Sequence, residues 1–177
     1  MEWWVGVEQA LHDVPHAVAG AVATNAYAPE RFTHDLDVVV LPTDAPAAQG
    51  ALLTAGWTMN GILVIVPRTT WSNVAGNSLD VIELATPWAR DAIIVAQGNR
   101  IAGMPTMSMS YLVHMKLMAS RTVDLGDVSR MLGRADMVQV TDARTLVKRL
   151  GTPDDVADFD QLRRMGQLER YGDMSSL

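Results

Sequence analysis

The stretch Arg31-Phe32-Thr33-His34-Asp35-Leu36-Asp37-Val38-Val39-Val40-Leu41 decides how the rest of the chain is interpreted. Its second half is a β-branched run that predicts a buried strand over Val38–Leu41, closed by Pro42. Asp35 and Asp37 stand at the entrance of this strand. Because alternate residues of a strand point to one face, the two carboxylates would share a face, roughly 6.6–6.8 Å apart along the chain.

Two carboxylates held this close repel each other unless positive charge lies between them. A pair of divalent cations about 3.5–4 Å apart, as in two-metal phosphoryl and nucleotidyl transfer, would supply that charge. The alternative is structural, with one aspartate capping a turn and the other solvated. This stretch alone leaves both interpretations open.

Size and composition indicate a globular protein. The 177 residues suffice for one domain, or for one domain with a helical appendage, and 49% of them are apolar. No apolar run reaches the length of a membrane span, and the N-terminus lacks a signal-type segment, so we expect no membrane partner. The absence of cysteine excludes disulfides and thiolate metal sites. Together these features predict a cytoplasmic protein.

The net charge of −6 is unevenly distributed along the chain. Residues 1–115 contain four basic and ten acidic residues, whereas residues 116–177 contain ten of each. The acidic excess therefore falls in the half that carries Asp35 and Asp37, where it attracts cations and argues against a general nucleic-acid coat. A phosphorylated ligand would need basic residues from the second half.

Apolar periodicity and the positions of glycine and proline predict an α/β fold that gives way to helices near residue 105. We expect a mixed sheet of about four to five strands with flanking helices. The expected strands are His16–Ala19, Val38–Leu41, Trp57–Met59, Ile62–Val66 and Leu79–Leu84, with a loop over Trp71–Asn77. The main expected helices are Asp44–Ala55, Pro87–Gln97, Met109–Ser120, Asp124–Leu132, Thr141–Leu150 and Thr152 to about Tyr171. We therefore expect an α/β core over residues 1–105 and a helical C-terminal portion, residues 106–177, packed on it.

Gly20 stands between the first expected strand and a helix that begins at Ala21. Free backbone N–H groups and the helix dipole make such a helix N-terminus an anion site. The alternative is that the glycine only permits close contact between helix and strand.

Asp80 lies near the start of the expected strand Leu79–Leu84, on the same face as Ile82. Burying an unpaired carboxylate is costly, so this position predicts a charged partner or a metal ion. A capping role at the strand end is the alternative.

Lys116 begins a second informative segment. If one helix carried residues 116–124, Lys116, Ser120 and Asp124 would lie along one side, and the ammonium group could reach a phosphate. The alternative is a solvated helix face with ion pairs.

Two blocks of sequence match a known pattern. The first is Ala19-Gly20-Ala21-x-Ala23 followed by Pro29-x-Arg31-x-Thr33-x-Asp35-x-Asp37, and the second is Leu112-x-x-x-Lys116-Leu117-x-Ala119-x-Arg121-x-x-Asp124. They resemble the motifs of minimal nucleotidyltransferases of the polymerase-beta superfamily, in particular the abortive-infection AbiEii/AbiGii group and its small bacterial relatives. The resemblance covers roughly residues 15–132 and departs at the turn, where the family has Gly-Gly or Gly-Ser and this chain has Ala19-Gly20.

The resemblance implies a nucleotidyltransferase-like fold and Mg2+-dependent transfer of a nucleoside monophosphate (NMP) from a nucleoside triphosphate (NTP), such as ATP, onto a hydroxyl group. Asp35, Asp37 and Asp80 would hold two Mg2+ ions, Asp80 being the family's third carboxylate. Asp80 would also help to activate the acceptor hydroxyl as a general base. The nucleotide would be bound by Gly20 and Ala21 at the turn, and by Lys116 and Arg121, which would counter charge on the transferring group.

The acceptor is open: RNA, a protein or a small molecule would each supply a hydroxyl. The resemblance further implies a toxin–antitoxin or phage-defence setting with a partner protein. The alternative function is a catalytically weak or inactive nucleotidyltransferase-fold protein that acts as a binding or antitoxin-like partner. The three aspartates favour the enzyme, and the altered turn at Ala19 favours the alternative. A third possibility is an α/β domain whose acidic pair is structural.

Overall fold

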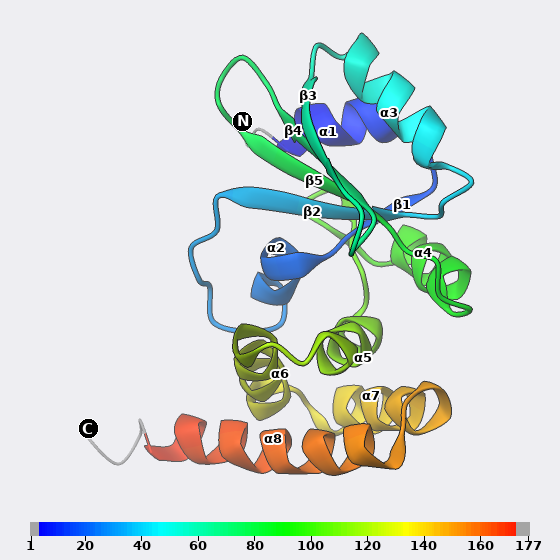
Figure 1. The fold of residues 1–177 in the computed structure, drawn as a ribbon. Helices are drawn as coiled ribbons and strands as arrows, with labels where there is room; N and C mark the ends of the chain where they lie inside the picture. Colours follow the sequence, from blue (N-terminus) through cyan, green and yellow to red (C-terminus); the bar gives the residue numbers. More distant parts are fainter. Residues whose placement is uncertain (1–3, 173–177) are drawn as a thin grey trace. The chain divides into compact units, whose positions relative to one another are not determined.

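The computed structural model describes residues 4–172, and the parts of our predictions that concern residues 1–3 and 173–177 lie outside this range. The described chain forms two compact units. One consists of residues 4–23 and 31–107, and the other of residues 24–30 and 108–172. The predicted mixed sheet, flanking helices and helical C-terminal part are all present (Figure 1). That residues 1–105 and 106–177 are separate domains stays a proposal.

A five-stranded sheet forms the centre of the first unit. Its strands are β1 (His16–Val18), β2 (Asp35–Val40), β3 (Thr58–Leu63), β4 (Arg68–Ser72) and β5 (Ser78–Glu83). They lie in the order β1-β2-β5-β4-β3, with β2 and β5 parallel and the other neighbours antiparallel. The sheet is therefore mixed, as predicted, and its parallel pair, β2 and β5, consists of the two strands that carry the three aspartates.

Helices complete this unit: α1 (Trp4–Leu11), α2 (Gly20–Asn25, whose last two residues belong to the second unit), α3 (Ala45–Thr54) and α4 (Ala89–Gly98). Two short strands, β6 (Arg100–Ile101) and β7 (Met104–Pro105), form a separate hairpin. The apolar pairs Leu36–Leu79 and Val38–Val81 of β2 and β5 are buried, and α1 and α3 cover one face of the large sheet (Figure 1). The opposite face of β2 and β5 carries the aspartates.

Two predictions about the middle of the chain are wrong. The apolar run Ile62–Val66 is not one strand, because β3 ends at Leu63 and the next residues turn toward β4, leaving Ile65 fully exposed. The predicted loop beginning at Trp71 overlaps β4, in which Trp71 is fully buried. Pairing with neighbouring strands, rather than local hydrophobicity, decides both boundaries.

Four helices make up most of the second unit: α5 (Met109–Ala119), α6 (Thr122–Arg134), α7 (Met137–Leu150) and α8 (Pro153–Gly172). Helix α7 begins four residues before the predicted start at Thr141 because Asp136 caps it. The Asp136 carboxylate accepts a hydrogen bond from the Gln139 backbone N–H at 2.8 Å, and the Gln139 side chain accepts one from the Asp136 backbone N–H at 3.1 Å. No helix between residues 4 and 172 combines the length and the apolar character needed to cross a bilayer.

Helices α6 and α8 cross at two glycines. A Cβ atom at Gly133 would overlap the backbone of Gly166, and one at Gly166 would overlap the Ser129 carbonyl. Gly126, also in α6, has no heavy atom within 4 Å of the position its Cβ would take. Only two of these three glycines are therefore required by packing.

We predict opposite effects of alanine at the two α6 glycines. Gly133→Ala should lower the free energy of unfolding by about 1–3 kcal/mol, because a backbone contact cannot yield as a flexible side chain does. Gly126→Ala should raise it by roughly 0.5–1 kcal/mol through helix propensity. Urea denaturation followed by circular dichroism measures both, and stabilisation by both substitutions would contradict the close crossing.

Candidate active site

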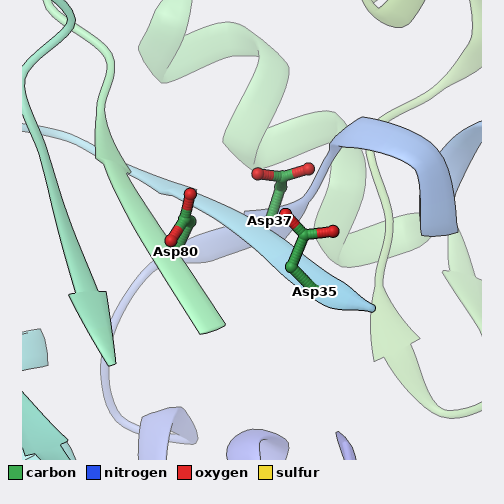
Figure 2. Close-up of side chains that lie close together, drawn as sticks. All are labelled: Asp35, Asp37 and Asp80. Atoms are coloured by element: carbon green, nitrogen blue, oxygen red, sulfur yellow. The ribbon is translucent and has the colours of Figure 1, made fainter. Parts of the chain in front are cut away.

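Three aspartates converge on one face of the sheet. In the parallel register of β2 and β5, Asp37 lies directly beside Asp80, and Asp35 lies opposite Ser78. One carboxylate oxygen from each aspartate lies within 4.8 Å of the others (Figure 2). The predicted sharing of a face by Asp35 and Asp37 is confirmed, and the sheet brings Asp80 to the same place.

The three carboxylates have different surroundings. Asp80 is buried, with 6% of its surface exposed, whereas Asp35 and Asp37 are half-buried. The Thr33 hydroxyl donates a hydrogen bond to Asp35 Oδ1 at 2.7 Å. Burial raises the pKa of Asp80, the Arg68 guanidinium opposes this rise, and the Asp35 carboxylate adds to it. Additional positive charge would therefore favour the ionised form of Asp80.

These residues fit a divalent cation. Carboxylate oxygens are the hard ligands that Mg2+ takes, at about 2.0–2.1 Å. One oxygen from each aspartate lies within 4.8 Å of the others, so all three can turn toward one ion between them. Asp35, Asp37 and Asp80 could therefore hold Mg2+.

Gly20 lies directly against this site. Its φ of +59° is in the left-handed region, and a Cβ atom there would overlap the Asp37 carboxylate. The neighbouring Ala19 N–H donates a hydrogen bond to the Asp37 carbonyl at 2.8 Å. The close-contact interpretation of Gly20 is confirmed, and phosphate binding by Gly20 and Ala21 stays a prediction.

Gly20→Ala should destabilise the protein more than the same substitution at Gly56, a matched control. Gly56 also has a positive φ, +82°, but has open space where its Cβ would be. Gly56→Ala should cost about 1–2 kcal/mol of unfolding free energy, the typical cost of the left-handed conformation. Gly20→Ala adds the overlap with Asp37 to that cost. Equal losses of unfolding free energy for the two variants, measured by urea denaturation, would show that Gly20 is not in close contact with Asp37.

Comparison with known proteins identifies the fold. No protein-family model matches the sequence, and no curated protein matches it significantly. The structure is similar to the solution structure of the antibiotic-resistance factor ANT(2'')-Ia, with a TM-score of 0.51 and 17% identity, covering 97% of this chain and 92% of that one. It is equally similar to the crystal structure of ANT(2'')-Ia in complex with adenylyl-2''-tobramycin, with a TM-score of 0.51 and 17% identity over 94% of this chain and 95% of the other.

The chain has a nucleotidyltransferase fold. The nucleotidyltransferase-like fold expected from the sequence is confirmed, and the resemblance to the polymerase-beta superfamily and its AbiEii/AbiGii group stays a prediction.

Sequence reasoning gave no role to Arg68, which belongs to the same site. Its Nη1 lies 3.0 Å from Asp80 Oδ2. The available signal was alternation along β4, where Arg68, Thr70 and Ser72 are half-buried and the intervening Thr69 and Trp71 are buried. That pattern indicates a strand with one polar face, but it does not indicate which strand lies beside it.

The structure decides between the two interpretations of Lys116, in the second unit of this nucleotidyltransferase fold. The condition that one helix carries residues 116–124 is not met, because α5 ends at Ala119 and Ser120 takes a left-handed φ of +53°. The separate helices predicted over Met109–Ser120 and Asp124–Leu132 are confirmed as α5 and α6. The solvated face is wrong, because Lys116 is only 4% exposed. Its ammonium group lies 2.7 Å from Asp127 Oδ2 and 3.2 Å from Asp124 Oδ1.

Two arginines complete this cluster. Arg121, whose side chain is largely exposed, donates from Nε to Asp124 Oδ2 at 2.6 Å, and Arg130 pairs with Asp127. Lys116 therefore has a structural role in neutralising two buried carboxylates. Nucleotide binding by Lys116 and Arg121 stays a prediction.

Lys116→Ala should lower the free energy of unfolding by about 3–5 kcal/mol, the range for removing one partner of a buried ion pair. Lys148→Ala is the matched control, because Lys148 is the chain's other lysine and is exposed on α7. The control should change stability by about 0–1 kcal/mol. Similar small losses for both variants, measured by chemical denaturation, would argue against the structural role.

Proposed function

We propose that this protein is a Mg2+-dependent nucleotidyltransferase that moves an NMP from an NTP onto an acceptor hydroxyl. The observation that carries the proposal is the meeting of Asp35, Asp37 and Asp80 on adjacent strands, with oxygens within 4.8 Å of one another. The nucleotidyltransferase fold supports it. A purely structural acidic pair would not require a third aspartate to converge on the same point.

Each residue has a definite role in this proposal. Divalent cations, when bound, supply positive charge that neutralises the phosphates and polarises the reacting phosphoryl group. Asp35 and Asp37 hold the cations, and Asp80 completes the set of ligands. The oxygen of the acceptor hydroxyl bonds to the α-phosphorus of the NTP while pyrophosphate leaves, and Asp80 accepts the proton of that hydroxyl. Burial raises the pKa of Asp80 and so makes its carboxylate a stronger base.

The phosphates would be bound by the Gly20–Ala21 turn, with Lys116 and Arg121 countering their charge. In this proposal the Lys116 ammonium group, which donates hydrogen bonds to Asp124 and Asp127, contributes positive charge. Unchanged NTP affinity in a folded Lys116 variant would remove the residue from the nucleotide site.

A small-molecule hydroxyl is the first acceptor class to test. ANT(2'')-Ia was crystallised in complex with adenylyl-2''-tobramycin. The acidic excess of residues 1–115, which carry the three aspartates, favours a cationic or neutral acceptor over a polyanion. RNA and protein hydroxyls remain proposed alternatives. The cytoplasmic location and the toxin–antitoxin or phage-defence partner rest on sequence reasoning and stay predictions.

The second candidate function is a catalytically weak or inactive nucleotidyltransferase-fold protein that acts as a binding or antitoxin-like partner. It is favoured by Ala19, which is fully buried where the resembling family has glycine. This candidate predicts calorimetric binding of NTP with Mg2+ but no transfer to any acceptor pool.

The deciding experiment uses α-labelled NTPs, Mg2+ and separate pools of RNA, protein and small hydroxyl compounds. Wild-type protein should label one pool, and Asp37→Asn should label none. Without metal, Asp37→Asn should unfold at no lower temperature than wild type, because the substitution relieves repulsion between carboxylates. Asp91→Asn, at an exposed position on α4, is the charge-matched control and should keep activity. Wild-type transfer by Asp37→Asn would overturn the assignment.

A further inference from the structure

Strand β4 adds a basic residue to the face that carries the aspartates. In the antiparallel register of β4 and β5, Thr70 lies opposite Asp80 and Arg68 lies opposite Ile82. Directly opposed residues share a face, and diagonal neighbours are within reach of long side chains. Arg68 therefore lies where its guanidinium meets the carboxylate of Asp80.

The contact compensates a buried charge. Arg68 Nη1 lies 3.0 Å from Asp80 Oδ2, and the side chains are 33% and 9% exposed. An ionised carboxylate this buried is costly without a partner, and Asp35 and Asp37 add repulsion. The guanidinium therefore supplies, in the metal-free protein, part of the positive charge that the three carboxylates require.

The same contact opposes cation binding. A divalent ion held by all three aspartates must share the Asp80 carboxylate and sit close to a second positive charge. The guanidinium is also not fully hydrogen-bonded within residues 4–172, where no group accepts from its buried Nε atom. This unsatisfied donor leaves Arg68 less firmly held than a bidentate arginine would be.

We propose that Arg68 is a positioning residue. Its ion pair with Asp80 keeps this carboxylate in place in the metal-free protein, and the ion pair breaks when a divalent cation binds. Arg68 thereby lowers the affinity of the site for the cation while it stabilises the empty triad. The inference rests on the proposed function, since it takes the three aspartates to be the cation ligands.

The test measures Mn2+ binding to the whole protein, without nucleotide, by electron paramagnetic resonance. Arg68→Gln removes the competing charge and should tighten Mn2+ binding by about tenfold, because one unit charge a few ångströms from the ion is lost. Arg68→Lys keeps the charge and should stay close to wild type. Arg90→Gln, an exposed arginine on α4, is matched for net charge and should change the affinity by less than about twofold.

Thermal unfolding gives a second readout. Arg68→Gln should unfold at a lower temperature than wild type in chelator, and this difference should shrink in saturating Mg2+, since the cation then replaces the lost charge. If the variant does not fold without metal, folding on addition of Mg2+ supports the inference. Failure of Mg2+ to restore folding contradicts it.

The possible failures are distinguishable. If wild type binds Mn2+ and Asp37→Asn does not, the proposed metal site stands. Arg68→Gln with unchanged or weaker Mn2+ affinity, or with the same loss of thermal stability in chelator and in Mg2+, then overturns only the role of Arg68. If wild type itself binds no Mn2+, the metal site of the proposed function falls, and this inference falls with it.

Discussion

Mutual repulsion among Asp35, Asp37 and Asp80 is the constraint on which the site depends. The carboxylates approach one another because the opposite face of the same strands is apolar and buried, with Leu36 beside Leu79 in the parallel register. A slip of one residue would expose that apolar face and bury the aspartates, so core packing determines the register. The stability of the core thereby holds together three negatively charged carboxylates that would otherwise move apart. Positive charge placed near them therefore stabilises the site.

The two units compensate their buried carboxylates in different ways. In the second unit, Lys116, Arg121 and Arg130 surround Asp124 and Asp127, so each buried carboxylate has basic partners. In the first unit, Arg68 pairs with Asp80, and the half-buried Asp35 accepts a hydrogen bond from a neutral hydroxyl. In the first arrangement each carboxylate is paired with basic side chains. In the second, three carboxylates lie within 4.8 Å of one another beside Arg68.

Backbone packing adds precision to the site of the three aspartates. Gly20 allows the turn between β1 and α2 to lie against the Asp37 carboxylate, and the Ala19 N–H bonds to the Asp37 carbonyl. Asp37 is therefore positioned from both its backbone and its side chain. The fold thus places these three carboxylates on a hydrogen-bonded pair of strands rather than on loops.

The sequence by itself determined the features that depend on local periodicity. The strand after Asp37, the shared face of Asp35 and Asp37, and the change from α/β to helix near residue 105 follow from spacing along the chain. Only the tertiary structure decided which strands are neighbours, and so which side chains meet. It placed Arg68 against Asp80, and it turned the chain at Ser120 so that Lys116 reaches Asp127. Strand pairing and helix packing bring together residues that are distant in sequence. A local sequence pattern does not encode which residues meet, because the packing of the core decides which strands and helices become neighbours.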